Sequence, residues 1–329
     1  MKNVLFASTA MIVGFAGIAA ADVTISGNAE MGIFGVDSDV EADDQDVQFH
    51  NDVDVTFTMS GETDGGLAFG ASVDLDEAGN LGDEEDNIGV AIFLSGAFGT
   101  VTLGDTDGAL DWALTEVNFN SGSIRDDETE HAGFNGNGGL DGFGLGDNQV
   151  LRYDYTVGDF AFAVSAEQLQ ENDTLSGDVN NQISGETLGI GFRYAVDLGG
   201  SQINLGLGYQ DHSGELSDGT DVDADAIGVS ANATFGAITA GVSYLDLEVD
   251  DADLGYEHFG VGIGYTEGAI SASLNYGEYD NDDGTEDEGF GLSAGYDLGG
   301  GASIQFGYGD GDEDGVDVET FSLGVRMNF

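Results

Sequence analysis

The sequence predicts an all-β fold: a transmembrane antiparallel up-and-down β-barrel of about 16 strands. Three observations support this fold class. Apolar and polar residues alternate with period two from Asp22 to the end of the chain. Tight turns alternate with longer acidic connections, as expected for a barrel with short turns at one end. Tyr194, Tyr209 and Tyr296 fall on the apolar face near strand ends, which is typical of an aromatic girdle at a membrane interface.

Composition excludes several other classes. The chain of 329 residues carries 64 acidic side chains against five Lys and Arg, a formal net charge of −59, and contains neither Cys nor Pro. Nucleic-acid binding depends on Lys and Arg, so no nucleic-acid partner is expected. Disulfide scaffolds and thiolate metal sites require Cys. With 40% hydrophobic and 10% aromatic residues, the chain is too apolar to be a disordered acidic segment.

The first 21 residues have the pattern of a secretory signal peptide. Lys2 precedes an apolar run from Val4 to Ala20, and the run ends in the small residues Ala19, Ala20 and Ala21. The predicted domain organisation is therefore a cleaved signal peptide, residues 1–21, followed by one barrel domain, residues 22–329. The protein is expected to be exported.

The alternation predicts 16 strands. In chain order they cover residues 22–33, 47–59, 66–75, 87–95, 100–104, 149–157, 160–169, 185–197, 201–210, 224–235, 237–245, 256–266, 269–279, 289–297, 301–309 and 318–329. Longer acidic loops are expected at residues 37–46, 76–86, 246–254, 280–288 and 310–317. The sheet must close on itself, because each unpaired backbone group in lipid costs several kcal/mol.

Two segments resemble a known family. The chain ends in FSLGVRMNF, residues 321–329, which resembles the carboxy-terminal strand by which outer-membrane barrels are recognised for assembly, with Phe329 as the terminal signal. GAFGTVTLGD at residues 96–105 and NQVLRYDY at residues 148–155 resemble strands five and six of the Gram-negative general porins, most of all their purple-bacterial, alphaproteobacterial branch. The resemblance implies a homotrimer of 16-stranded barrels in the bacterial outer membrane, in contact with lipid and lipopolysaccharide. It also implies passive diffusion of small hydrophilic solutes and a third external loop that folds into the lumen.

The connection from Gly104 to Asn148 is the candidate for that loop. It has 45 residues, and loops of this length are usually functional. Leu110, Ala113, Leu114 and Val117 have helical spacing, which predicts a short helix with one face on the barrel wall. The candidate constriction residues of this loop are Asp105, Asp107, Asp111, Glu116, Arg125, Asp126, Asp127, Glu128 and Glu130, and Asp141 and Asp147 follow. The alternative is an external solvated loop.

The arginines of the predicted strands all take the polar face. Arg152, Arg193 and Arg326 do so, as a barrel requires, because Arg on the lipid face costs roughly 2–4 kcal/mol near the midplane. One hypothesis is that Arg152 and Arg193 oppose the acidic third loop and create a transverse field, while Arg326 pairs structurally near the rim. The alternative is a lumen of one sign, because the related porins usually have more basic residues here.

Acids on the polar face favour the single-sign lumen. Rings of carboxylates concentrate cations and exclude anions. The candidate lumen acids are Glu30, Asp52, Asp54, Asp74, Asp154 and Glu167. A cation-selective channel is therefore the predicted function.

Other functions have weaker support. Asp310, Asp312 and Asp314 imitate the start of an EF-hand, but the twelfth position is Phe321 and not Glu. Ca²⁺ or Mg²⁺ at the acidic loops remains a hypothesis. The four histidines are scattered, with His50 and His258 on the lumenal face, His131 in the long loop and His212 in an external loop. No nucleophile–base set suggests an enzyme, and no cofactor is expected. The alternative function is a secreted or surface-attached acidic β protein that binds Ca²⁺ or a partner.

Overall fold

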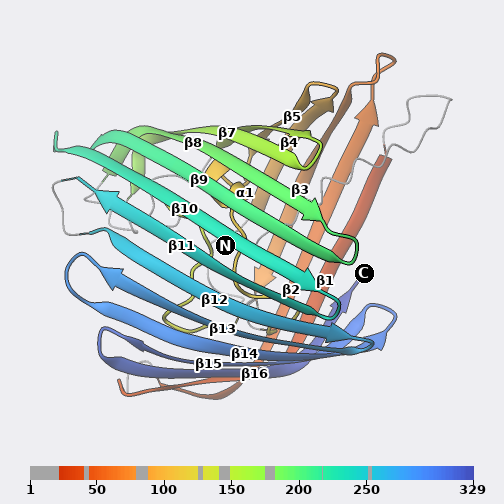
Figure 1. The fold of residues 1–329 in the computed structure, drawn as a ribbon, viewed down its shortest axis with the longest axis vertical. Coiled ribbons are helices and arrows are strands. Elements are labelled where there is room, and N and C mark those ends of the chain that lie inside the picture. Colours follow the sequence, from red (N-terminus) through yellow and green to blue (C-terminus); the bar gives the residue numbers. More distant parts are fainter. Residues whose placement is uncertain are drawn as a thin grey trace.

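The computed structural model describes residues 22–40, 44–78, 88–124, 129–140, 149–174, 182–216, 218–250 and 254–329. In these residues 16 antiparallel strands form one closed barrel, in which each strand pairs with its neighbours in the chain and β16 pairs with β1 (Figure 1). The predicted fold class is thereby confirmed. No helix in the described part of the chain is long and apolar enough to cross a membrane.

The strands have the following bounds. They are β1 (Asp22–Ser38), β2 (Gln45–Glu62), β3 (Ala68–Ala78), β4 (Ile88–Gly96), β5 (Gly99–Gly104), β6 (Val150–Val157), β7 (Phe160–Thr174), β8 (Gln182–Asp197), β9 (Ser201–Leu216), β10 (Asp221–Phe235), β11 (Ile238–Val249), β12 (Tyr256–Glu267), β13 (Ile270–Asn281), β14 (Glu286–Gly299), β15 (Ala302–Glu313) and β16 (Val316–Asn328).

Alternation sends apolar side chains outward and polar side chains into the lumen. On β2, Phe49 and Val53 are exposed on the outer face, with 93% and 43% of their surface accessible. Asp52 lies between them in sequence and is buried on the inner face. Because successive side chains of a strand point to opposite sides, each strand contributes both to the apolar outer band and to the lumen.

The seam between the first and last strands is closed by backbone and ionic contacts. Glu30 on β1 lies opposite Arg326 on β16 in the register, and the two side chains form an ion pair of 3.1 Å. The N–H of Phe329 donates to the carbonyl oxygen of Gly27 at 2.9 Å. Arg326 therefore has the structural partner that its position near the chain end suggests.

Several acidic connections are shorter than predicted, because the strands continue into them. β15 runs to Glu313 and β16 begins at Val316, so most of the segment predicted as the loop 310–317 is strand. Asp314 and Gly315 form the turn, with φ of 53° and 80°. His212 likewise lies in β9 and not in a loop, and is buried. Apolar residues no longer alternate with polar ones at these strand ends, although the backbone pairing between neighbouring strands continues.

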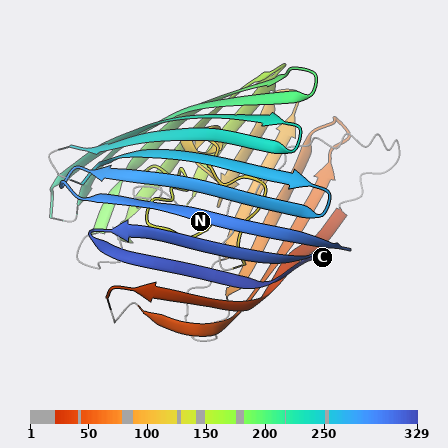
Figure 2. The same ribbon diagram turned by 60° about the horizontal axis from the view of Figure 1, so that its bottom comes forward.

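The connection that follows β5 lies inside the barrel. Figures 1 and 2 show its described residues as a yellow segment within the ring of strands. It begins with the short helix α1 (Ala109–Ala113), which packs against β7, β8 and β9. We call residues 105–149 the third loop.

Candidate pore constriction

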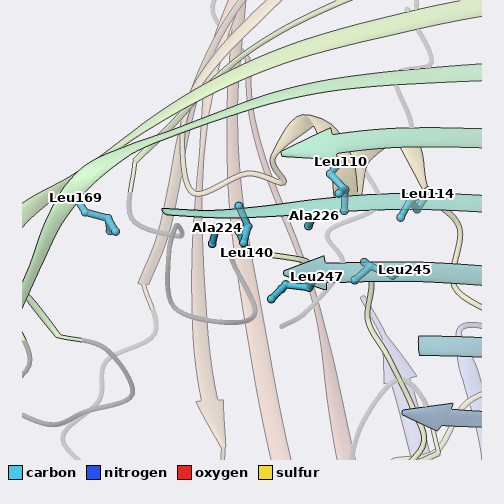
Figure 3. Close-up of a cluster of buried hydrophobic side chains, with 8 residues drawn as sticks. All are labelled: Leu110, Leu114, Leu140, Leu169, Ala224, Ala226, Leu245 and Leu247. Carbon is cyan, nitrogen blue, oxygen red and sulfur yellow. The ribbon is translucent and has the colours of Figure 1, made fainter. Parts of the chain in front are cut away.

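The helix of the third loop is held on the inner wall by an apolar cluster. Leu110 and Leu114 pack with Leu140, which lies later in the same loop (Figure 3). The wall contributes Leu169, Ala224, Ala226, Leu245 and Leu247. The helix is shorter than predicted, since it ends at Ala113 and Val117 lies beyond it, yet Val117 is also buried. The predicted apolar face therefore contacts the wall as expected.

Hydrogen bonds fix the loop at points that are far apart on the barrel. Ser165 on β7 accepts from the N–H of Ala109 at 2.9 Å, and Ser230 on β10 accepts from the N–H of Thr115 at 3.0 Å. Further along, Ser293 on β14 donates to the carbonyl oxygen of Ser121 at 2.8 Å. The loop therefore crosses the inner wall from β7 to β14 and does not extend into solvent.

Wall glycines allow the backbone of the loop to lie directly on the strands. At several glycines of the wall, an added Cβ would collide with a backbone carbonyl oxygen of the loop. The pairs are Gly191 with Ala109, Gly206 with Ala113, Gly262 with Val117, Gly264 with Phe119, Gly309 with Glu130, and Gly277 with Gly133. Because real Cβ contacts are essentially never under 3.0 Å, these positions admit only glycine unless the loop moves. We call them the glycine seats.

The two wall arginines that were predicted to oppose the third loop both contact it. Arg152 donates to the carbonyl oxygen of Asp107 at 2.6 Å, and its guanidinium lies 3.7 Å from the Asp107 carboxylate and 3.8 Å from Asp154. The Arg193 guanidinium lies 4.4 Å from the centre of the Trp112 ring, within the range of a cation–π interaction. The structure therefore sets both positive charges against the start of the loop, next to its acids.

Two carboxyls of the loop have perturbed acidity. The pKa of Asp111 is raised well above its ordinary value, first because burial removes water from the carboxylate and then because Asp107 and Glu116 repel its charge. Arg193 and Arg152 act in the opposite direction. Burial also raises the pKa of Asp105.

The other candidate acids lie on several strands. Asn28 donates to Asp54 at 2.7 Å, and Thr56 donates to Asp74 at 2.9 Å. Three of the remaining candidates, Glu30, Asp52 and Glu167, are buried on the inner face. Arg125, Asp126, Asp127 and Glu128 lie outside the described residues, as do Asp141 and Asp147. Among the described residues, no group of three or more His, Asp or Glu is placed to hold a metal ion.

Two features of the site were not predicted. Trp112 is the single tryptophan of the chain and lies beneath Arg193. Its position next to Asp111 in the predicted helix was the sequence feature that could have indicated its place in the site. The glycine seats were also missed, although glycines recur with period two on the lumenal face of β12 at Gly260, Gly262 and Gly264.

Comparisons with known proteins agree with this geometry. The Gram-negative porin family matches residues 7–316. A porin of Rhodobacter capsulatus is 31% identical, with 94% of this chain and all of the relative covered. A solved porin structure refined at 1.8 Å resolution has a TM-score of 0.66 and 26% identity, and covers 94% of this chain and all of that one. A variant of Rh. blastica porin has the same coverage, with a TM-score of 0.62 and 16% identity, and therefore shares the fold. The chain belongs to the Gram-negative porin family.

Proposed function

We propose that this porin is a cation-selective channel for ions and small hydrophilic solutes. The observation that carries the proposal is the placement of the arginines. Arg152 and Arg193 contact the loop that bears Asp107 and Asp111, so their positive charges lie beside acids. Arg326 is paired with Glu30. These contacts leave the acids of the lumen in excess.

The excess can be counted among the described candidates. Eleven acids face three arginines on the inner wall and the loop. The acids are Glu30, Asp52, Asp54, Asp74, Asp105, Asp107, Asp111, Glu116, Glu130, Asp154 and Glu167. A negative potential of this kind draws in cations and repels anions. The Debye length is about 8 Å at 0.15 M salt, so the field extends across a narrow opening.

The reversal potential in a KCl gradient tests the proposal. Purified protein in a planar bilayer should give a reversal potential of the sign expected for K⁺ permeation. The selectivity should weaken as salt rises toward ~0.5 M, where the Debye length falls to roughly 4–5 Å. Anion selectivity at low salt refutes the proposal.

Trp112 offers an independent measurement of the same property. Because it is the sole tryptophan and lies on the third loop against Arg193, its fluorescence reports the ion concentration near these residues. Cs⁺ should quench it more than I⁻ does at equal concentration, while the neutral quencher acrylamide controls for accessibility. Stronger quenching by I⁻ contradicts a negative constriction.

The cellular setting belongs to the same proposal. We infer export by a cleaved signal peptide, residues 1–21, assembly in the bacterial outer membrane as a homotrimer, and contact with lipid and lipopolysaccharide. Family membership and the exposed apolar outer face support this setting. They do not favour a secreted calcium-binding protein. Heat-modifiable migration on gels and a need for detergent during extraction test the membrane location, and extraction in water alone refutes it.

A further inference from the structure

The return part of the third loop, residues 129–134, is held by two buried histidines. His131 of the loop lies with Nε2 at 2.5 Å from Oδ1 of Asn275 on β13. His258 of β12 lies with Nε2 at 3.0 Å from the carbonyl oxygen of Gly133. Both partners are acceptors, so each imidazole donates from Nε2. We call this pair of contacts the histidine clasp.

The other ring nitrogen of each histidine has no partner. Within the described residues, Nδ1 of His131 and Nδ1 of His258 are buried without a hydrogen bond. A neutral imidazole tolerates this, since its Nδ1 is then an acceptor. A protonated imidazole carries a second N–H, and here that donor has no acceptor.

The surrounding groups do not compensate a positive charge. Tyr279 packs on the His258 ring at 4.5 Å between centroids and donates its hydroxyl to the carbonyl oxygen of Phe134 at 3.0 Å. Tyr256 packs on Tyr279 in turn. On β14, Asp287 accepts hydrogen bonds from Asn281 and from the N–H of Asp314, at 3.0 Å and 2.9 Å.

Further acids lie near His131. Glu130 precedes it in the loop, and Glu313 and Asp314 line the same cavity as His131. Neither clasp histidine makes an ion pair in the described part of the chain, in contrast to His50, whose Nε2 lies 3.9 Å from the Glu30 carboxylate.

We propose that His131 and His258 are positioning residues that hold the return part of the third loop on the wall while both rings are neutral, and that their protonation releases it into the pore. The loop backbone here lies on the glycine seats at Gly277 and Gly309, and the side chains of Thr129 and Ala132 that meet the wall beside it are small. The clasp and its neighbouring hydrogen bonds therefore carry much of the attachment.

The direction of the pH dependence follows from burial. Burial lowers the pKa of His131 below its ordinary value, which is about 6.5. The held loop thus binds protons less readily than the released loop. The clasp is at full strength above pH ~6.5 and weakens as the pH falls toward the lowered pKa.

Single-channel recording between pH 7.5 and pH 4 tests this inference. The unmodified porin should show closures and substates that increase as the pH falls, with the open fraction dropping through a midpoint below pH ~6.5. The double variant His131→Gln, His258→Gln keeps an amide N–H near each Nε2 position and does not titrate. It should lose this transition. Protonation of carboxylates affects both proteins equally, so the difference between them isolates the histidines.

The matched control is His50→Gln, which removes a histidine that has a carboxylate neighbour. This variant should keep the acid closures. Heat-modifiable migration checks the folding of every variant. If the double variant does not fold, His131→Gln alone should give a shallower transition, because one titrating group remains.

Three results overturn the clasp: an unchanged open fraction down to pH 4, the same acid closures in the double variant, or their loss in His50→Gln. The inference rests on the proposed channel function, but a different experimental result refutes each of them. A barrel that conducts at pH 7.5 but shows no histidine-dependent transition refutes the clasp alone. A folded barrel that conducts at no pH refutes the channel.

Discussion

A methyl group on the seat at Gly262 should narrow the pore. An added Cβ would collide with the carbonyl oxygen of Val117 and would lie 2.8 Å from its carbonyl carbon and 3.2 Å from its Cβ. Most of these contacts are backbone and cannot rotate away. The wall strand is hydrogen-bonded on both sides, to β11 and β13, so the loop must move and not the wall.

The size of the displacement follows from the same distances. Ordinary van der Waals contacts begin at 3.4 Å, so the carbonyl carbon of Val117 must recede by about 0.6 Å and its oxygen, which makes the worst overlap, by about 1.6 Å. The added methyl group lies between wall and loop, so the loop moves toward the pore axis. For an opening on the order of 10 Å across, a shift of about 1.6 Å leaves roughly 70% of the open area, so Gly262→Ala should reduce the conductance by roughly a quarter.

Gly260→Ala is the matched control for this variant. It lies on the same face of the same strand, but an added Cβ there meets side-chain atoms, namely Oγ of Ser243 at 2.7 Å, and Cε1 of His258 and Cγ2 of Val117, both at 3.2 Å. The Ser243 hydroxyl can rotate, so the loop backbone should stay in place and the conductance should change less. Single-channel conductance in 1 M KCl, where charge effects are screened, measures both. Equal conductance of Gly262→Ala and the unmodified porin would refute the idea that glycine seats set the pore size.

Three further predictions concern charge and assembly. Asp111→Asn should lower cation selectivity little at pH 5 and more at pH 8, because the raised pKa keeps the Asp111 carboxyl protonated to higher pH. Reversal potentials measured at both pH values test this, and an effect of the substitution that becomes smaller as the pH rises contradicts it. Arg193→Gln should increase cation selectivity with the barrel intact, because a cation–π contact contributes only about 0.5–1 kcal/mol at an exposed site; a shift toward anions in the same assay contradicts it. Deletion of Phe329 should reduce the yield of heat-modifiable barrel in the outer-membrane fraction several-fold, and an unchanged yield argues against its role as an assembly signal.

The strands were predictable because the membrane makes the two faces of each strand different. All 16 predicted segments lie within or across strands of the barrel. The alternation also placed Arg152, Arg193 and Arg326 on the inner face. Above the membrane both faces meet water, so apolar alternation is no longer required. For this reason the acidic end of β15, up to Glu313, had the composition of a loop although it pairs with β16.

The path of the third loop was less predictable, because its contacts join residues distant in sequence. The spacing of Leu110, Ala113 and Leu114 indicated an apolar face, and that face is buried. Nothing in the spacing indicated that Ala109 would bond Ser165, or that Arg152 would reach Asp107. These pairings depend on the curvature of the closed sheet, which brings β6 and β7 beside the start of the loop.

The seating of the loop also explains where the negative charge of the chain can lie. Burying a carboxylate without a partner costs several kcal/mol, so the wall beneath the loop has to be neutral. The buried lumenal residues described on β10–β13 are indeed uncharged or neutral: Ala224, Ala226, Ser230, Asn232, Ser243, Leu245, Leu247, His258, Ser273 and Asn275. Four of the candidate lumen acids lie on β1, β2 and β3, where Glu30 pairs with Arg326, Asn28 donates to Asp54, Thr56 donates to Asp74, and Asp52 lies opposite Glu30 in the register. The other two, Asp154 and Glu167, lie on β6 and β7, near the start of the loop. The neutrality needed to seat the loop thus keeps acids out of the buried inner face described on β10–β13, and His258 is the one histidine among the buried residues of that face.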